Sequence, residues 1–458
     1  MSALWKNCLE EAILTEIQLQ MQLSFDNMMK FQRELYLQQL IERRENGLVK
    51  VICGLRRCGK SYLLFQIYLD YLHGEGVDDN HIIQLALDDD QCADLRNPDN
   101  LSSFVRSRII DRSSLYYLFI DEIQYAISKE EMENRDQPVR LYGVLNGLMR
   151  LGNVDIYVTG SNSKMLSTDI LTEFRGRSDR VELHPLSFSE VYSQLGGDRS
   201  QVYEDYALFG GMPMVYAKPS VHAKARYLAD LFQEVYFKDI QERNDIELPN
   251  VLEELTDVLC SNVGSLTNVS KLQRTIQSTH HTAVDDETLS AYLKYLTEAF
   301  LFKCSKRYDV KGKRYFDYPS KYYCADLGLR NARLNFRQQE ENHIMENIIY
   351  NELVSRDYQV DVGVVKLNES DEMGKRHQKN CEIDFVINRG MKRYYIQSAL
   401  TLPDLEKTQQ ELRPLLSVKD MFRKVLITKT SARPWLDENG VLRLGLYDFL
   451  LDDKLLDL

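Results

Sequence analysis

Four short apolar runs near the start of the chain are separated by segments with helical periodicity. Short apolar runs that end in glycine or polar residues are typical of buried strands. These runs cover residues 48–53, 81–87, 115–120 and 154–158. Apolar residues recur at helical spacing in residues 62–69 and 139–151. Strands that alternate with helices predict an α/β domain.

From residue 186 onward the pattern predicts mostly helices, and strands follow them. Helical patterns cover residues 186–195, 203–209, 221–245, 251–260, 268–275, 288–300 and 343–355. The glycines and proline at 210–213 interrupt them. Strands are predicted at 302–308, 314–318, 360–365, 382–387 and 393–399. This second half therefore combines a helical region with at least one mixed α/β region.

Composition narrows the class of protein. The chain of 458 residues carries a net charge of −12, which excludes a uniformly basic surface for nucleic acid. Its 8 cysteines form no C-x-x-C pair, so neither a zinc site nor a disulfide framework is predicted. No apolar run approaches the ~18 residues of a membrane span. Charged residues lie too early for a signal peptide, and free thiols favour a cytoplasmic location.

Residues 54–61 fit the phosphate-binding pattern G-x-x-x-x-G-K-[ST]. A predicted strand precedes the pattern and a predicted helix follows it, which is the context that the pattern requires. The glycines let backbone N–H groups turn toward a phosphate, Lys60 supplies a charge for the β- and γ-phosphates, and Ser61 a hydroxyl for Mg²⁺. The predicted nucleotide contacts are Gly54, Arg57, Cys58, Gly59, Lys60, Ser61 and Tyr62.

Asp121 and Glu122 end the apolar strand at 115–120. A carboxylate at the end of a core strand near a phosphate loop can hold Mg²⁺ through its water shell. A second carboxylate beside it can polarise the attacking water. The two motifs with one strand between them in sequence are typical of ATPases that carry their own catalytic Glu.

Two further polar groups have alternative interpretations. Ser161 and Asn162 follow the strand at 154–158, where they reach the γ-phosphate or the lytic water, or else cap a helix. Arg175, Arg177 and Arg180 lie further on. One of them stabilises transition-state charge, or all three are solvated surface residues.

Cys58 lies between cations inside the phosphate loop, just before a helix. Both surroundings favour the thiolate, which predicts a lowered pKa and a reactive thiol. The alternative is a side chain that points into the core and behaves as a small inert hydrophobe.

The hairpin at 303–321 is rich in basic residues and poor in acidic ones. Such a hairpin suits contacts with DNA phosphates; a solvated hairpin and a surface for the protein's own domains are the alternatives. Its cations are Lys303, Lys306, Arg307, Lys311, Lys313, Arg314 and Lys321.

The ordered motifs GLRRCGKS, FIDEIQ, TGSNS, LTEFRGR, LHPLSFSE and FGGMP resemble those of a prokaryotic family of AAA-like P-loop ATPases. The C-terminal half of that family is a domain of unknown function, a winged helix followed by a restriction-endonuclease-like fold. The resemblance extends from about residue 31 to the end. It implies an ATPase core at 31–200, a helical connector at 201–250, a winged helix at 251–335 and a nuclease-like domain at 336–458. The helical pattern before residue 31 predicts an N-terminal helical extension at 1–30.

The resemblance also implies roles for single residues. It makes Asp121 the carboxylate that holds Mg²⁺ and Glu122 the catalytic base. It places Ser161 or Asn162 at the sensor position, and Arg177 becomes the best candidate for the arginine that stabilises transition-state charge. Gly54, Gly59, Lys60 and Ser61 form the phosphate loop.

The nuclease-like domain departs from the pattern of its fold. Glu346 and Asp384 occupy the first two acidic positions, but Gln397 replaces the following Glu and Ala399 the Lys. A neutral amide is a poor Mg²⁺ ligand, and alanine can neither orient nor polarise water. A degenerate site is therefore expected; an active nuclease would need a lysine from elsewhere, such as Lys392.

Together these features predict a cytoplasmic protein that binds ATP and Mg²⁺, hydrolyses ATP, and couples nucleotide state to a C-terminal output half. The alternatives are a nucleotide-switched module that binds DNA or protein with little turnover, and an active nuclease. No base-reading motif separates ATP from GTP. DNA at the basic hairpin and further copies of the chain are the candidate partners, and no membrane partner is expected.

Overall fold

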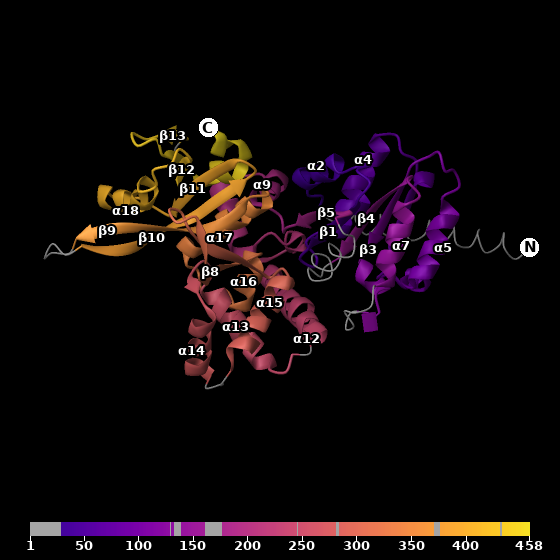
Figure 1. The fold of residues 1–458 in the computed structure, drawn as a ribbon, viewed down its shortest axis with the longest axis horizontal. Coiled ribbons are helices and arrows are strands. Elements are labelled where there is room, and N and C mark those ends of the chain that lie inside the picture. The colour runs from indigo at the N-terminus through magenta and orange to yellow at the C-terminus, as the bar shows by residue number, and fades with distance from the viewer. Residues whose placement is uncertain are drawn as a thin grey trace, which may run out of the picture. The chain divides into compact units, whose positions relative to one another are not determined.

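The computed structural model describes residues 29–128, 130–131, 139–160, 176–244, 246–280, 284–370, 376–430 and 433–458. The chain divides into two compact units, Met1–His184 and Pro185–Leu458 (Figure 1). Among the described helices, none combines the length and the hydrophobicity needed to cross a membrane.

The N-terminal unit is built on a sheet of five parallel strands in the order β2-β3-β4-β1-β5. The strands are β1 (Val49–Gly54), β2 (Ile82–Ala86), β3 (Tyr116–Asp121), β4 (Val154–Gly160) and β5 (Ser178–Leu183). Every residue of β1 and β3 is buried, which explains their uninterrupted apolar sequences. The four predicted strands and the α/β class are confirmed, and β5 is an addition.

Helices accompany this sheet, and α5 packs on α7 while α2 packs on β5. The α-helices are α2 (Glu34–Glu42), α3 (Lys60–Tyr62), α4 (Leu69–Gly74), α5 (Pro98–Arg108) and α7 (Arg140–Met149). A π-helical segment, η1 (Leu63–Tyr68), joins α3 to α4. Short 3₁₀ turns are η2 (Asp79–His81), η3 (Asp90–Arg96) and η4 (Ile123–Ala126).

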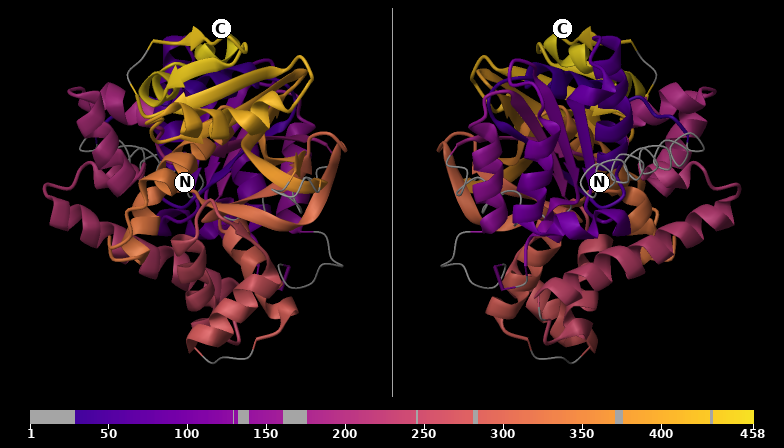
Figure 2. Two further views of the ribbon diagram at one scale, coloured as in Figure 1. Left: turned by 90° about the vertical axis from the view of Figure 1, so that its left-hand side faces the viewer. Right: turned by 90° about the vertical axis from the view of Figure 1, so that its right-hand side faces the viewer.

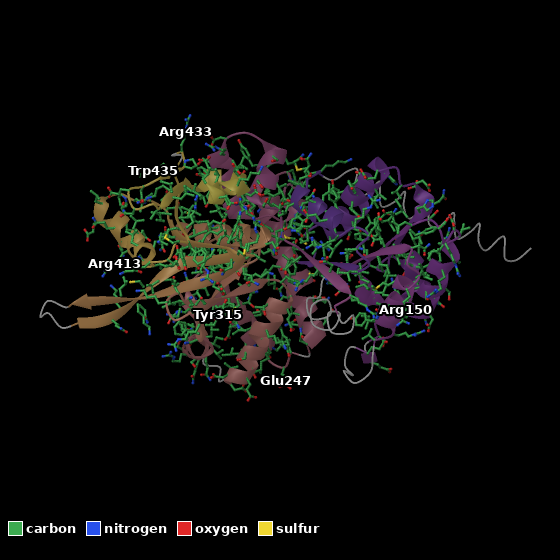
Figure 3. All side chains as sticks on the ribbon, turned by 45° about the horizontal axis from the view of Figure 1, so that its top comes forward. Arg150, Glu247, Tyr315, Arg413, Arg433 and Trp435 are labelled. Atoms are coloured by element: carbon green, nitrogen blue, oxygen red, sulfur yellow. The ribbon has the colours of Figure 1, made fainter. Side chains whose placement is uncertain are left out.

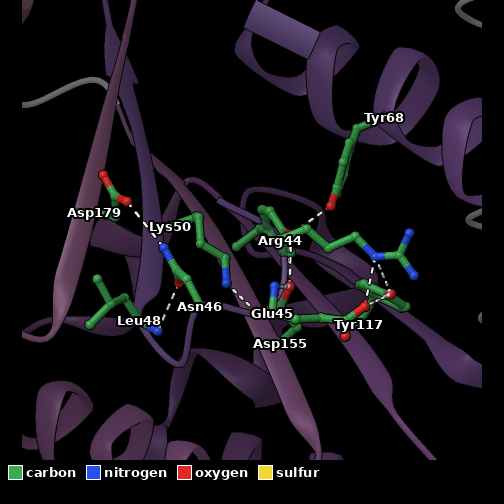
Figure 4. A network of polar contacts seen from close by, with 10 residues as sticks. Arg44, Glu45, Asn46, Leu48, Lys50, Tyr68, Tyr117, Asp155 and Asp179 are labelled. Carbon is green, nitrogen blue, oxygen red and sulfur yellow. Dashed lines mark hydrogen bonds and ion pairs between the residues drawn. The ribbon is translucent and has the colours of Figure 1, made fainter. Parts of the chain in front are cut away.

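A buried ion pair ties β1 to β4 inside this unit (Figure 4). Lys50 is fully buried and contacts Asp155, which also accepts a hydrogen bond from Tyr157 at 2.8 Å. The Tyr157 hydroxyl lies 2.5 Å from that of Tyr68 on η1. Burial lowers the pKa of Lys50, and Asp155 opposes this effect. The network thus fixes η1, which follows the phosphate loop, against the strands on which the loop stands.

The C-terminal unit begins with helices and continues into a second sheet. The first helices are α9 (Phe188–Leu195), α10 (Arg199–Phe209), η6 (Pro213–Val215), α11 (Val221–Asp230), η7 (Leu231–Phe237) and α12 (Lys238–Asn244). Then α13 (Pro249–Ser261), α14 (Val269–His280) and α15 (Asp286–Glu298) pack on one another and form the rose-coloured cluster of Figure 2. A hairpin follows this trio, as the sequence predicts.

That hairpin is part of a nine-stranded sheet, in the order β13-β14-β12-β11-β10-β9-β7-β8-β6. Its strands are β6 (Leu266–Thr267), β7 (Phe302–Asp309), β8 (Arg314–Cys324), β9 (Gln359–Ser370), β10 (Arg376–Arg389), β11 (Lys392–Ala399), β12 (Arg423–Thr428), β13 (Trp435–Leu436) and β14 (Leu442–Gly445). Strand β7 pairs in parallel with β9, so the hairpin and the strands from β9 onward belong to one hydrogen-bonded sheet. The accompanying helices are α16 (Leu327–Arg333), α17 (Glu341–Ser355), α18 (Leu405–Leu416), α19 (Leu446–Leu451) and η8 (Asp453–Asp457).

The FGGMP motif is a close-packed junction of this unit. A Cβ atom on Gly211 would lie 2.1 Å from the carbonyl oxygen of Leu186, and one on Gly328 2.0 Å from that of Phe209. The backbone N–H of Gly211 donates to the carboxylate of Asp326 at 2.6 Å. Asp326 also caps α16. Only glycine allows backbones to approach this closely, which accounts for the motif without any catalytic role.

Burial raises the pKa of Asp326 to about 6, while backbone N–H groups oppose this. The ordinary value in an unfolded chain is about 4. Between these values the folded protein binds the proton more tightly, so the carboxyl stabilises the fold fully below pH ~4 and loses that contribution as pH rises through ~6. Across this pH range, the contribution of Asp326 to the free energy of unfolding falls by roughly 3 kcal/mol.

We therefore expect the thermal midpoint of wild type to fall relative to that of Asp326→Asn as pH rises from 4.5 to 7.5 (roughly the titration window). The amide does not ionise, so the variant lacks this contribution. Thermal unfolding of both proteins across this range measures the difference. A difference that stays constant with pH would contradict the raised pKa.

Candidate nucleotide site

The phosphate loop leaves the carboxyl end of β1 and enters α3 at Lys60. Gly54 has φ 148°, and a Cβ atom there would lie 2.1 Å from the carbonyl oxygen of Leu183 on β5. Gly59, at φ 103°, caps the following helix. Both glycines of the motif are thus required by the backbone itself, one by close approach and one by a left-handed conformation.

Lys60 is buried, and its ammonium lies inside the loop. The Nζ atom donates to the carbonyl oxygens of Gly54 at 3.3 Å and Leu55 at 3.1 Å. Arg57 is exposed and left-handed at φ 59°, and Tyr62 is half-buried with its pKa raised by burial. The positive charge therefore stands within the concave face that the motif predicts for phosphate.

Parallel strands bring the acidic residues to the same edge of the sheet as the loop. Ser61 Oγ donates to Asp121 Oδ2 at 2.7 Å, although β4 separates their strands. Thr159, which is fully buried at the end of β4, donates to the other oxygen of Asp121. The backbone N–H of Glu122 donates to Thr159 Oγ1 at 3.1 Å. A continuous chain of hydrogen bonds therefore joins Ser61, Asp121, Thr159 and Glu122.

Asp121 is buried beside a second carboxylate. Burial first, and Glu122 next, raise the pKa of Asp121 to about 6, while hydrogen bonds from Thr159 and Ser61 oppose the rise. Its carboxylate and the Ser61 hydroxyl are oxygen ligands of the kind that Mg²⁺ prefers, and they converge on one point. These residues fit a Mg²⁺ ion bound with a nucleotide.

Glu122 turns the chain sharply at the end of β3. Its φ of 49° is left-handed, and its half-buried carboxylate accepts a hydrogen bond from the Gln124 side chain. The predicted base is therefore next to the predicted metal carboxylate and faces the same edge of the sheet.

Arg177 lies far from the phosphate loop of its own chain, and its predicted role in stabilising transition-state charge stays a prediction. Arg177 is exposed just before β5, beside Val49 at the start of β1, whereas Gly54 lies beside Leu183 at the other end. Five residues of strand separate these ends by about 17 Å, so Arg177 does not join the site of its own chain.

Cys58 is fully buried, with Sγ 3.5 Å from the carbonyl oxygen of Leu183. Burial raises the pKa of its thiol, and the charge of Lys60 does not overcome that effect. The prediction of a reactive thiolate is wrong, because the side chain points into the core rather than toward the phosphate face.

The structure describes β4 to its last residue, Gly160, but not the residues that directly follow it. Ser161 and Asn162 lie outside the described residues, and their predicted role stays a prediction. Thr159 was not predicted as a site residue. A threonine at the end of a core strand, followed by a glycine and then by polar residues, is the pattern that could have indicated it.

Comparison with known proteins identifies the N-terminal unit. Residues 46–192 match a family described as AAA domain, and residues 200–340 match a domain of unknown function, DUF8612. An uncharacterized protein of Haemophilus influenzae is 32% identical over 401 residues, covering 86% of this chain and 92% of that protein. The chain belongs to the family of that protein. It is an AAA-domain protein of the P-loop ATPase class.

Other similarities are weaker. The uncharacterized protein MJ1544 of Methanocaldococcus jannaschii is 27% identical over 389 residues, covering 81% of this chain and 79% of that one. The solved structure of the Walker-type ATPase PABY2304 of Pyrococcus abyssi has a TM-score of 0.45 and 16% identity, covering 67% of this chain and 96% of that one.

The predicted nuclease-like residues of this AAA-domain protein also lie together. Gln397 on β11 donates to Asp384 on β10 at 3.2 Å. Lys321 on β8 pairs with Glu346 on α17 and with Glu382 on β10. Lys392, which the alternative of an active nuclease would need, lies at the start of β11 and pairs with Asp457 on η8. Lys321 is the lysine that reaches the cluster.

The basic hairpin loses one of its predicted phosphate contacts. Lys321 is 3% exposed and turned inward, so it does not face a nucleic acid. Lys306, Lys311, Lys313 and Arg314 remain exposed, as does Tyr315 near the tip, which Figure 3 labels. The predicted DNA surface is therefore smaller than the sequence implies.

The burial of Cys58 predicts slow modification. We expect maleimide to label Cys304, which is exposed, well before Cys58 or Cys53, which are buried. Nucleotide should not change the labelling of Cys58, since the loop already covers it. Peptide mass spectrometry after limited labelling measures this. Modification of Cys58 as fast as that of Cys304 would contradict the buried placement.

Proposed function

We propose that this AAA domain binds Mg-ATP at the phosphate loop and hydrolyses it, with Glu122 as the general base. The observation that carries the proposal is the hydrogen-bond chain from Ser61 through Asp121 and Thr159 to the backbone N–H of Glu122, since it fixes a hydroxyl, a carboxylate and the backbone of the proposed base at one sheet edge. Ligands of open α/β sheets bind at the carboxyl ends of the strands, where these groups lie.

Each residue has a distinct task in this reaction. The backbone N–H groups of the loop cradle the phosphates, and Lys60 exchanges its carbonyl partners for phosphate oxygens. Ser61 and Asp121 hold Mg²⁺, which when bound neutralises charge that develops on the phosphates. Glu122 accepts a proton from the attacking water.

The Gln124 side-chain amide donates a hydrogen bond to one oxygen of the Glu122 carboxylate. This hydrogen bond turns that carboxylate oxygen of Glu122 toward the Gln124 amide. For catalysis one oxygen must face the water, and the half-buried position of Glu122 leaves room for that change. We assign Gln124 an orienting role on the base.

Nucleotide state is proposed to act on the C-terminal unit as output. The rival interpretation is a nucleotide-switched module with little turnover that contacts DNA through the exposed cations of the hairpin. Steady-state turnover separates the two, because a switch binds nucleotide without continuous release of phosphate.

Substitution at Lys60 and Glu122 separates binding from hydrolysis. Lys60→Ala should abolish nucleotide binding, because it removes the charge inside the loop. Glu122→Gln should retain binding and lose about 10²–10⁴ in turnover, since only the base changes. Fluorescent nucleotide titration and phosphate release measure the two steps. Wild-type turnover in Glu122→Gln would refute the assignment of the base.

Thr159 offers a second test that does not touch the proposed metal ligands or the base. Thr159→Val keeps the shape but removes the hydroxyl that holds Asp121 and the Glu122 backbone. We expect nucleotide affinity without Mg²⁺ to persist and turnover to fall by about 10²-fold, because a misplaced base and carboxylate act poorly.

Thr159→Ser is the matched control, since it restores the hydroxyl and should restore most of the turnover. Thermal unfolding of both variants excludes a general loss of fold. Equal turnover in Thr159→Val and Thr159→Ser would show that the hydroxyl does not position the site.

A further inference from the structure

Three carboxylates of the C-terminal unit surround one lysine. Lys321 Nζ lies 2.8 Å from Glu346 Oε1 and 2.7 Å from Glu382 Oε1. Asp384, two residues after Glu382 on β10, is buried in the same cluster. Lys321 itself is 3% exposed, so its ammonium is an internal cation rather than a surface charge.

Further protein donors reach Glu346 and both oxygens of Asp384. Tyr323 donates to Glu346 Oε1 at 2.7 Å. Ser398 donates to Asp384 Oδ2 through its backbone at 2.8 Å and through its hydroxyl at 2.7 Å, and Gln397 donates to Oδ1 at 3.2 Å. Ammonium, hydroxyl and amide donors therefore occupy directions in which carboxylates would bind a metal.

The electrostatics agree with this geometry. Burial alone would lower the pKa of Lys321, but Glu346, Asp384 and Glu382 outweigh it and raise that pKa. Lys321 is thus charged at neutral pH. Burial and the Glu346 carboxylate raise the pKa of Asp384 to about 7, which shows that one cation does not fully compensate three carboxyl groups.

Packing closes the space around the pair. A Cβ atom on Gly264 would lie 3.3 Å from Glu346 Oε1, so the chain after α13 contacts the carboxylate directly. Among the described residues, no group of three His, Cys, Asp or Glu side chains is arranged to hold a metal ion. The lysine stands between carboxylates that would otherwise converge.

We propose that Lys321 takes the place of a divalent metal ion in the nuclease-like site, so that the site is closed to metal in the wild-type protein. Removal of the ammonium leaves three neighbouring carboxylates without a counter-charge, and such oxygens bind a hard divalent cation. The C-terminal unit accordingly works without metal and without cleavage of DNA.

Mn²⁺ binding to the nucleotide-free full chain tests this proposal. Wild type should bind no Mn²⁺ in the C-terminal unit. Lys321→Ala should bind about one Mn²⁺ per chain, at least roughly tenfold more tightly than wild type, with Glu346, Glu382 and Asp384 as oxygen ligands. The double variant Lys321→Ala/Asp384→Asn should lose this site, and Lys306→Ala, an exposed lysine of the same hairpin, should behave as wild type.

The free Mn²⁺ signal in electron paramagnetic resonance measures binding, and thermal unfolding measures the rise in midpoint that Mn²⁺ should give only to Lys321→Ala. A folded Lys321→Ala protein that binds no Mn²⁺ would overturn the proposal. If that variant does not fold, Lys321→Met, which keeps the length of the side chain but removes both the charge and the donor, replaces it with the same expectation.

Wild type provides an independent test that needs no variant to fold. Mn²⁺ bound by the nucleotide-free wild type and lost in Asp384→Asn would overturn the proposal, because the native site would then hold metal. Cleavage of DNA with Mg²⁺ or Mn²⁺ that disappears in Asp384→Ala would overturn it as well. Neither result bears on ATP hydrolysis, which uses other residues.

Discussion

The hydrogen-bond chain from Ser61 through Asp121 and Thr159 to Glu122 is the contact on which the nucleotide site depends. It exists because β4 lies between β1 and β3, so that the ends of three strands meet at one edge. The Lys50–Asp155 pair holds β1 against β4 from within the core and keeps this edge in register. A shift of either strand by one residue would turn the Thr159 side chain away from Asp121 and from the Glu122 backbone N–H.

The cluster around Asp121 and the cluster around Lys321 differ in whether an ammonium lies among the carboxylates. In the N-terminal unit, Asp121 has hydroxyl donors, and its pKa rises to about 6. In the C-terminal unit, Lys321 supplies an internal ammonium to Glu346 and Glu382. A metal ion would therefore relieve the first arrangement and would have to displace a covalently tethered cation in the second. We therefore propose that metal binds at the nucleotide site and not at the cluster around Lys321.

The sequence predicted much of the fold because its motifs and apolar runs are local. The four core strands, the phosphate loop and the helix–hairpin order all follow from residues close in the chain. Lys321 was misjudged because its partners lie 25 and 61 positions away, and no local pattern distinguishes an inward lysine from its exposed neighbours. The prediction of a reactive Cys58 is wrong for a similar reason. Strand β5, which covers the thiol, has a largely polar sequence that does not predict a buried strand. The position of Arg177 relative to the phosphate loop depends on how β5 is aligned with β1, and this alignment is known only from the structure.

Release of phosphate from ATP by the wild-type protein, with Mg²⁺ present and after its chelation, tests the central claim most directly. The arrangement at the edge of the N-terminal sheet predicts continuous release that requires Mg²⁺, because Ser61 and Asp121 act on the phosphates only through that ion. Tight binding of ATP with no release above the spontaneous rate would contradict it and would leave the protein as a nucleotide switch.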